Sequence, residues 1–159
     1  MLPIGVGVGD RVGLSESEKR SWDAFLESAA LVYDRINSAL IEAHDVTFFE
    51  TQVLYILNGI PNRSTRMGLL SQQLSLSPSR ITQLVRGLES RGFVLRVRGE
   101  ADKRVVLAQL TRAGGACLQM ALRTYAREVQ KWYLAPLSRQ QMTALGAIGR
   151  QVAERLERR

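Results

Sequence analysis

Apolar residues recur every three or four positions near the start of the chain, a spacing that places side chains on one face of an α-helix. The series follows Ser15, a good N-cap, and Glu18 three residues later completes a capping box. The pattern continues to His44 and predicts one long amphipathic helix over residues 15–44. Its apolar members are Trp22, Phe25, Leu26, Ala29, Tyr33, Ile36 and Leu40.

Three shorter helices follow, with separate start signals. Thr47 and Glu50 repeat the capping-box spacing and predict the beginning of a second helix. The segment 66–74 has the composition of a short helix. The segment 77–91 opens with Ser-Pro, which supplies a capping side chain and a proline suited to the first helical position.

Two short segments after these helices have the composition of β-strands. Residues 93–98 and 104–110 predict a β-hairpin with its tip at 99–103. Thr111 opens a further helix, Pro136 breaks it, and a last helix begins near Ser138. The fold class is therefore mainly α with a small β-hairpin, built from five or six helices.

The elements divide into four segments: a flexible arm at 1–13, an N-terminal helix within 14–45, a central region at 46–110 and C-terminal helices at 111–159. The first and last helices each carry a wide apolar stripe, which the small central region cannot cover alone. We expect both chain ends to form a helical dimerisation region. An intramolecular helical bundle is the alternative.

Charge is concentrated in the centre of the chain. The window 61–112 contains ten Lys or Arg and three acidic residues, so the whole formal charge of +7 lies in about one third of the sequence. Such a confined excess predicts binding to a polyanion, and nucleic acid is the first candidate. The order helix, turn, helix, basic hairpin is that of a winged helix-turn-helix.

The helix predicted over 77–91 has one apolar face and one polar face. Apolar side chains at +3, +4 and +7 from Ile81 must point to the core. Arg, Gln and Ser on the other face are suited to base edges and phosphates in a major groove. A solvated amphipathic helix is the plainer alternative. The candidate DNA-binding residues are Ser77, Ser79, Arg80, Thr82, Gln83 and Arg86.

The hairpin carries four cations that could contact the minor groove, whose narrow A·T-rich stretches attract arginine. These are Arg96, Arg98, Lys103 and Arg104. Asp102 lies two residues before Arg104 and could orient it through a charge-assisted hydrogen bond. The alternative for Asp102 is an ordinary turn residue.

The segment 69–114 resembles the MarR (multiple antibiotic resistance regulator) family of bacterial transcription regulators. The likeness extends more weakly over nearly all of residues 15–155. The matching features are the helix-turn-helix, Leu84-Val85-x-x-Leu88-Glu89-x-x-Gly92, Arg96 after the first strand, Asp102-x-Arg104, and Leu110-Thr111-x-x-Gly114.

The resemblance implies a winged helix-turn-helix homodimer whose interface is formed by the first and last helices. Two recognition helices would enter successive major grooves of a pseudo-palindromic operator, with Arg104 in the minor groove, braced by Asp102. It implies a repressor released by a small phenolic or lipophilic ligand or by thiol oxidation. Arg86-Gly87 stands where the family often has Asp-Arg, and this glycine could allow a closer approach to DNA or simply be tolerated.

Aromatic residues suggest an effector pocket between the first two helices and the winged region, although such residues are more often core. The candidates are Trp22, Tyr33, His44, Phe48 and Tyr55. His44, the only histidine, is otherwise suited to a helix C-terminus. Cys117, the only cysteine, cannot form an internal disulfide and is expected to be a small buried residue.

Nothing in the sequence predicts an enzyme. Cys/His metal spacing, paired carboxylates and a phosphate-binding glycine loop are missing, so we expect no metal and no cofactor. No apolar run approaches the ~20 residues of a membrane helix, and cysteine usage fits a bacterial cytoplasm. Two rival functions remain: a winged-helix protein interaction module, and a small-molecule carrier with incidental DNA affinity.

Overall fold

The computed structural model describes residues 13–99 and 105–157. The predicted flexible arm at 1–13 falls outside this range except for Gly13. So do three predicted hairpin residues, Asp102, Lys103 and Arg104. In chain order the elements are α1 (Glu16–His44), α2 (Phe48–Gly59), η1 (Pro61–Arg63), β1 (Ser64–Arg66), α3 (Met67–Leu74), α4 (Pro78–Ser90), β2 (Val94–Arg98), β3 (Val106–Leu110), α5 (Arg112–Val129), the π-helical turn η2 (Gln130–Leu134) and α6 (Arg139–Glu157).

The chain forms two compact units. One contains residues 36–130, and the other joins the chain up to Arg35 with the chain from Lys131 onward. The boundary falls inside α1 and just after α5. The end of α1 and all of α5 pack with the central region because Leu40 and Leu118 are fully buried in its core.

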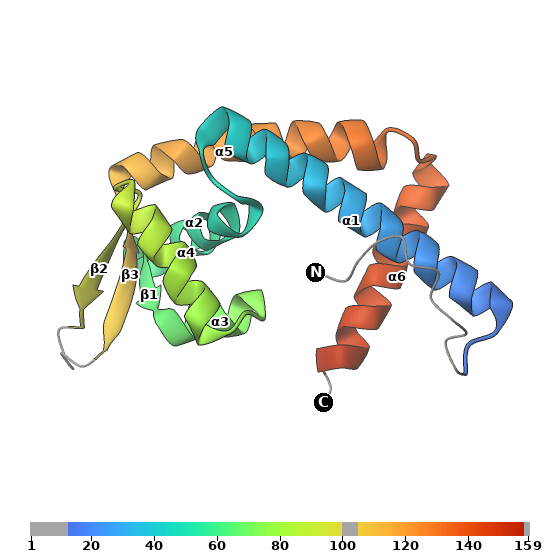
Figure 1. Cartoon of the computed structure of the whole chain (residues 1–159), viewed down its shortest axis with the longest axis horizontal. Helices are drawn as coiled ribbons and strands as arrows, with labels where there is room; N and C mark the ends of the chain where they lie inside the picture. Colours follow the sequence, from blue (N-terminus) through green and yellow to red (C-terminus); the bar gives the residue numbers. More distant parts are fainter. Residues whose placement is uncertain (1–12, 100–104, 158–159) are drawn as a thin grey trace. The chain divides into compact units, whose positions relative to one another are not determined.

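The central unit is built around a three-stranded antiparallel sheet in the order β1-β3-β2 (Figure 1). Val97 pairs with Leu107 across β2 and β3, and Thr65 pairs with Ala108 across β1 and β3. Helix α4 packs on β2 and on α2, and α3 packs on β1. The largest fully buried side chains are Leu40, Val46, Val53, Leu54, Leu57, Leu70, Ile81, Val85, Leu88, Val94 and Leu118.

Local capping signals begin the helices where the sequence predicts. At α2 the Thr47 hydroxyl accepts from the Glu50 N–H, and the Glu50 carboxylate accepts from the Thr47 N–H at 2.9 Å. Ser15 and Glu18 form the same box before α1, and hydrogen bonds from Ser15 lower the pKa of Glu18. Such exchanges satisfy backbone donors that lack a partner within the helix.

The third strand was not predicted. Ser64, Thr65 and Arg66 pair with β3, although the sequence placed Arg66 in a short helix. Three residues are too few to show a period of two, and the pairing partner lies more than forty residues away. The predicted class, mainly α with a small β wing, is confirmed.

The second unit contains the first part of α1, the η2 turn and α6. Among its described residues none is buried, while several large apolar side chains are exposed by about half or more. Examples are Phe25 at 53%, Leu31 at 57% and Ile148 at 59%. In the described part of the chain no helix combines the length and the hydrophobicity needed to span a bilayer.

Candidate nucleic-acid interface

Helix α4 has the shape expected of a recognition helix. The Ser77 hydroxyl accepts from the Arg80 N–H at 3.3 Å, and Pro78 occupies the first turn, where its missing N–H has no cost. The buried face is formed by Ile81, Leu84, Val85 and Leu88. This face fixes α4 against the core and turns the opposite face outward.

The outward side of α4 is polar and basic. We define the reading face as Ser79, Arg80, Gln83 and Arg86, all of which are exposed. Arg80 Nη1 donates to Gln83 Oε1 at 3.3 Å, so these two side chains already share an orientation. Ser79, Gln83 and Arg86 lie on one stripe with Arg80 beside it, as the helical spacing predicts, so two guanidinium groups and one amide are presented together.

Two predicted DNA-binding hydroxyls already have partners inside the helix. Thr82 is half-buried, and its hydroxyl donates to the Pro78 carbonyl oxygen at 2.9 Å. Ser77 is exposed but uses its hydroxyl as the helix cap. The Ser77 hydroxyl caps the helix and the Thr82 hydroxyl bonds the preceding turn, so both act within α4. The DNA contact of Thr82 stays a prediction, in which its hydroxyl oxygen would accept while its proton is used within the helix.

Gly87 is half-buried and lies close to α2. A Cβ at this position would lie 2.9 Å from Glu50 Oε1 and 3.4 Å from Arg91 Nη2. The glycine therefore leaves room for an ion pair between α4 and α2. This is a structural reason for the glycine, and the closer approach to DNA stays a prediction.

Arg96 and Arg98, two arginines predicted to contact DNA, have different surroundings on β2. Arg98 is exposed at the end of β2, where Gly99 N–H donates to the Val105 carbonyl at 2.9 Å and closes the described part of the hairpin. Arg96 is instead joined to Glu89 of α4, with Nε donating to Oε2 at 2.6 Å. The structure thus gives Arg96 an intramolecular partner that sequence reasoning missed.

Arg91 is a second internal cation that counted toward the predicted positive charge. Its guanidinium pairs with Glu50 and donates to the carbonyl oxygen of Asp45. Its Nε donates to the Gly87 carbonyl oxygen at 2.9 Å. These partners lie far from Arg91 in the sequence, so no local pattern predicts the contacts. The unusual glycine at position 87 was the only feature of the sequence that pointed to them.

The five residues proposed as an effector pocket, four aromatic residues and one histidine, are distributed over the two compact units. Trp22 and Tyr33 belong to one compact unit, and His44, Phe48 and Tyr55 belong to the other. His44 Nε2 lies 2.9 Å from Thr124 Oγ1, which links the end of α1 to α5. The rings of Phe48 and Tyr125 are 6.1 Å apart, so Phe48 is part of the packing, while Tyr55 is exposed.

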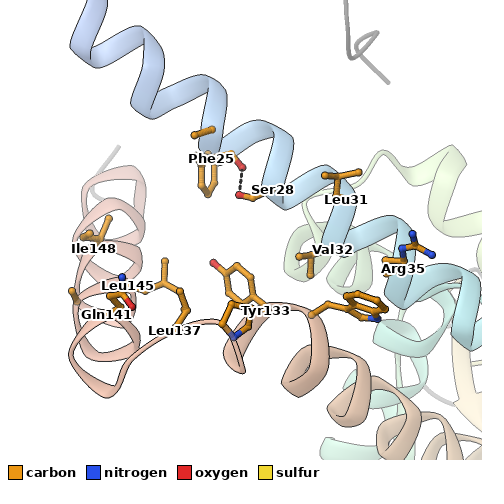
Figure 2. Close-up of a pocket in the computed structure, with 14 residues that line it drawn as sticks. Phe25, Ser28, Leu31, Val32, Arg35, Tyr133, Leu137, Gln141, Leu145 and Ile148 are labelled. Carbon is orange, nitrogen blue, oxygen red and sulfur yellow. Dashed lines mark hydrogen bonds between the residues drawn. The ribbon is translucent and has the colours of Figure 1, made fainter.

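A groove of about 790 Å³ lies within the second unit, on residues that the sequence did not single out together. Figure 2 shows Phe25, Leu31 and Val32 of α1 on one side and Leu145 and Ile148 of α6 on the other. The lining is mostly apolar and includes Trp132, over which the Arg35 guanidinium lies at 5.4 Å from the ring centre.

Cys117 is buried in α5, as expected. Burial raises the pKa of its thiol, while the nearby Arg91 charge acts in the opposite direction. A protonated, enclosed thiol is poorly suited to redox sensing. Among the described residues, no cluster of His, Cys, Asp and Glu has the arrangement of a metal site.

Comparison with known proteins agrees with this geometry. Residues 35–119, more than half of the chain, match the family described as transcriptional regulator SarA/Rot. The chain is 24% identical over 119 residues to an uncharacterised HTH-type transcriptional regulator, YhbI, of Bacillus subtilis (strain 168), covering 72% of this chain and 76% of YhbI.

Solved structures share the whole fold. Sco3205, a MarR family transcriptional regulator from Streptomyces coelicolor solved in complex with DNA, is 29% identical with a TM-score of 0.83, covering 90% of this chain and 93% of Sco3205. CouR from Rhodococcus jostii RHA1, solved bound to p-coumaroyl-CoA, is 20% identical with a TM-score of 0.71, covering 84% of this chain and 91% of CouR. The resemblance to MarR regulators is confirmed.

Proposed function

Because the chain belongs to the SarA/Rot family of transcriptional regulators, we propose that it is a homodimeric repressor that binds a pseudo-palindromic operator. The observation that carries this proposal is the reading face of α4, where Arg80, Gln83 and Arg86 are all exposed. The Sco3205 complex with DNA supports the same use of the fold.

The reading face would enter the major groove. Arginine bonds guanine O6 and N7 through two parallel donors, and glutamine bonds adenine N6 and N7. The hydrogen bond to Gln83 already orients Arg80. Both side chains therefore lose less conformational entropy when they bind DNA. Ser79 and the first turn of α4 can add contacts to phosphates.

The wing would contact the adjacent minor groove. Arg98 is exposed at the end of β2, and the sequence places Lys103 in the predicted hairpin tip and Arg104 directly after it. Arg104 is proposed as the inserted side chain, with Asp102 holding its guanidinium. Arg96 contributes by fixing the base of the wing through Glu89.

Dimer formation is proposed because the second unit has no buried residue of its own among those described. Its apolar groove between α1 and α6 offers Phe25, Leu145 and Ile148 to a second copy. Burial of such surface stabilises association by about 25 cal/mol per Å² of apolar area removed from water. A dimer would bring two α4 helices to half-sites about 34 Å apart.

Repression and its release complete the proposal. A dimer bound over a promoter blocks polymerase, and a small aromatic or lipophilic effector would favour a dimer with misplaced reading faces. CouR, which shares the fold and was solved with an aromatic acyl-CoA, supports this class of effector. The test adds aromatic acids and their CoA thioesters to the DNA-bound protein and measures release.

The decisive experiment is a fluorescence-anisotropy titration against the DNA upstream of its own gene and against a scrambled duplex at several salt concentrations. The proposal predicts preference for the upstream DNA and a log–log salt slope near −0.9 per phosphate contact. Gln83→Ala should relax that preference more than it lowers non-specific affinity. Weak, salt-insensitive binding to both duplexes would instead favour a protein interaction module.

A further inference from the structure

Arg91 joins three separate segments of the central unit at the end of α4. Its guanidinium pairs with Glu50 in the first turn of α2 and bonds the carbonyl oxygen of Asp45, just after α1. Its Nε returns to the Gly87 carbonyl of its own helix at 2.9 Å. One planar cation with donors in fixed directions therefore connects α1, α2 and α4.

The carboxylate that receives Arg91 is itself held firmly. Glu50 is only 7% exposed and accepts from the Thr47 N–H at 2.9 Å and from the Thr47 hydroxyl at 3.0 Å. Asp45 has a left-handed backbone, with φ of 54°, and its carboxylate lies 3.9 Å from Arg91 Nη1. The receiving site is fixed by the α2 cap rather than by mobile side chains.

Gly87 makes this contact sterically feasible. A Cβ there would come within 2.9 Å of Glu50 Oε1, so a side chain at 87 would displace the ion pair or push α4 away from α2. Gly87 follows Arg86 directly and lies one turn after Gln83, both members of the reading face. The ion pair therefore lies beside the C-terminal end of the reading face, on the same turns of α4.

We infer that Arg91 is a positioning residue for DNA recognition, which fixes α4 against the α1–α2 junction through Glu50 and does not itself contact DNA. The inference rests on the proposed role of the reading face. Hydrogen bonds to base edges tolerate only a few tenths of an ångström around 2.9 Å, so a small displacement of α4 affects discrimination first. Non-specific phosphate contacts tolerate the same displacement.

This role differs from that of a phosphate-binding cation in a measurable way. Removing a cation that contacts phosphate lowers the salt slope by about 0.9, because one fewer counterion is released. The Arg91 side chain is only 24% exposed and already paired. Its removal should leave the salt slope unchanged while lowering the ratio of specific to non-specific affinity.

The test uses the full chain and a duplex selected by the wild type from a random library, with a scrambled duplex as reference. Arg91→Met and Glu50→Gln should each lower discrimination about tenfold at an unchanged salt slope, and the double variant should lose no more than either single variant. Arg91→Lys, which keeps the charge but not the three directed bonds, should be intermediate. Gly87→Ala should act in the same direction without removing a charge.

A control separates positioning from general stability. Ala121→Gly removes a buried methyl group in α5 and should lower the unfolding midpoint without changing discrimination. Full discrimination in both Arg91→Met and Gly87→Ala, or additive losses in the double variant, would overturn the inference. A salt slope that falls by about 0.9 in Arg91→Met would make Arg91 a phosphate contact instead. If the wild type selects no duplex, the proposed function fails first and the inference fails with it.

Discussion

Arg96 of β2 and Glu89 of α4 form a hydrogen-bonded ion pair, with Nε and Oε2 2.6 Å apart and the Arg96 N–H also directed at Oε1 at 3.3 Å. The recognition helix and the base of the wing are therefore joined by two donors from one residue. This pair links the base of the wing to α4, and it occupies a cation that the charge count alone would assign to DNA.

Arg96 and Arg98 should consequently behave differently when replaced, although they lie on the same strand. Arg96→Ala should weaken operator binding with little change in salt slope, and Glu89→Gln should have a similar effect. Arg98→Ala should lower the slope by about 0.9, as expected for one lost phosphate contact. Anisotropy titrations from low to moderate salt give both slopes. Equal slope changes in the two alanine variants would remove the distinction.

The sequence predicted most of the fold because its signals are local. Ser15, Thr47, Ser77 and Thr111 begin helices through hydrogen bonds that reach three residues along the chain. Such contacts can be inferred from spacing alone. The exposed positions of Arg80, Gln83 and Arg86 followed from the same helical period.

The features that escaped prediction depend on distant residues. The space beside Gly87 is limited by Glu50, which lies in another helix. The internal roles of Arg91 and Arg96 require partners that no periodicity marks. The aromatic pocket stays a prediction, because its residues are distributed over two compact units and no local pattern determines which of them share a cavity.

Gly114 should be the most sensitive glycine to substitution. A Cβ there would lie 2.1 Å from the Phe93 carbonyl oxygen, which is backbone and cannot move aside. Gly114→Ala should destabilise the chain by about 2 kcal/mol or more, lowering the unfolding midpoint by roughly 4–8 °C.

Gly115 provides a matched control in the same turn of α5. A Cβ at Gly115 would make only an ordinary contact, at 3.7 Å from Arg63 Nη1. Gly115→Ala should therefore be neutral or stabilise by up to about 1 kcal/mol through helix propensity. Thermal unfolding followed by circular dichroism compares the two variants. Equal midpoints would show that the close approach at Gly114 is absent in solution.

Cys117 should make the stability depend on alkaline pH. Burial raises the pKa of its thiol above the ordinary value of 9.0, so the folded state retains a proton that the unfolded state releases. The contribution is fully present below that ordinary value and is lost as pH rises above it. In urea unfolding, the stability difference between wild type and Cys117→Ala should decrease from pH 8 to 10. A pH-independent difference would argue against a buried thiol.

The apolar groove should be part of a dimer interface. Leu145→Lys introduces a charge among Phe25, Val32 and Ile148 and should convert the protein to a monomer. Thr143→Lys adds the same charge to α6 outside the groove and should remain dimeric. Sedimentation velocity distinguishes the two masses. A dimeric Leu145→Lys variant would place the interface elsewhere.

The central claim is that two copies of α4 and its wing read duplex DNA together, and selection from a random duplex library tests it most directly. The account predicts enrichment of an inverted repeat whose half-site centres lie about 34 Å apart, one helical turn, with two chains bound per duplex. The Gln83→Ala protein should select the same spacing with a degenerate base in each half-site. Enrichment of no sequence, or of a single asymmetric site bound by one chain, would contradict the account.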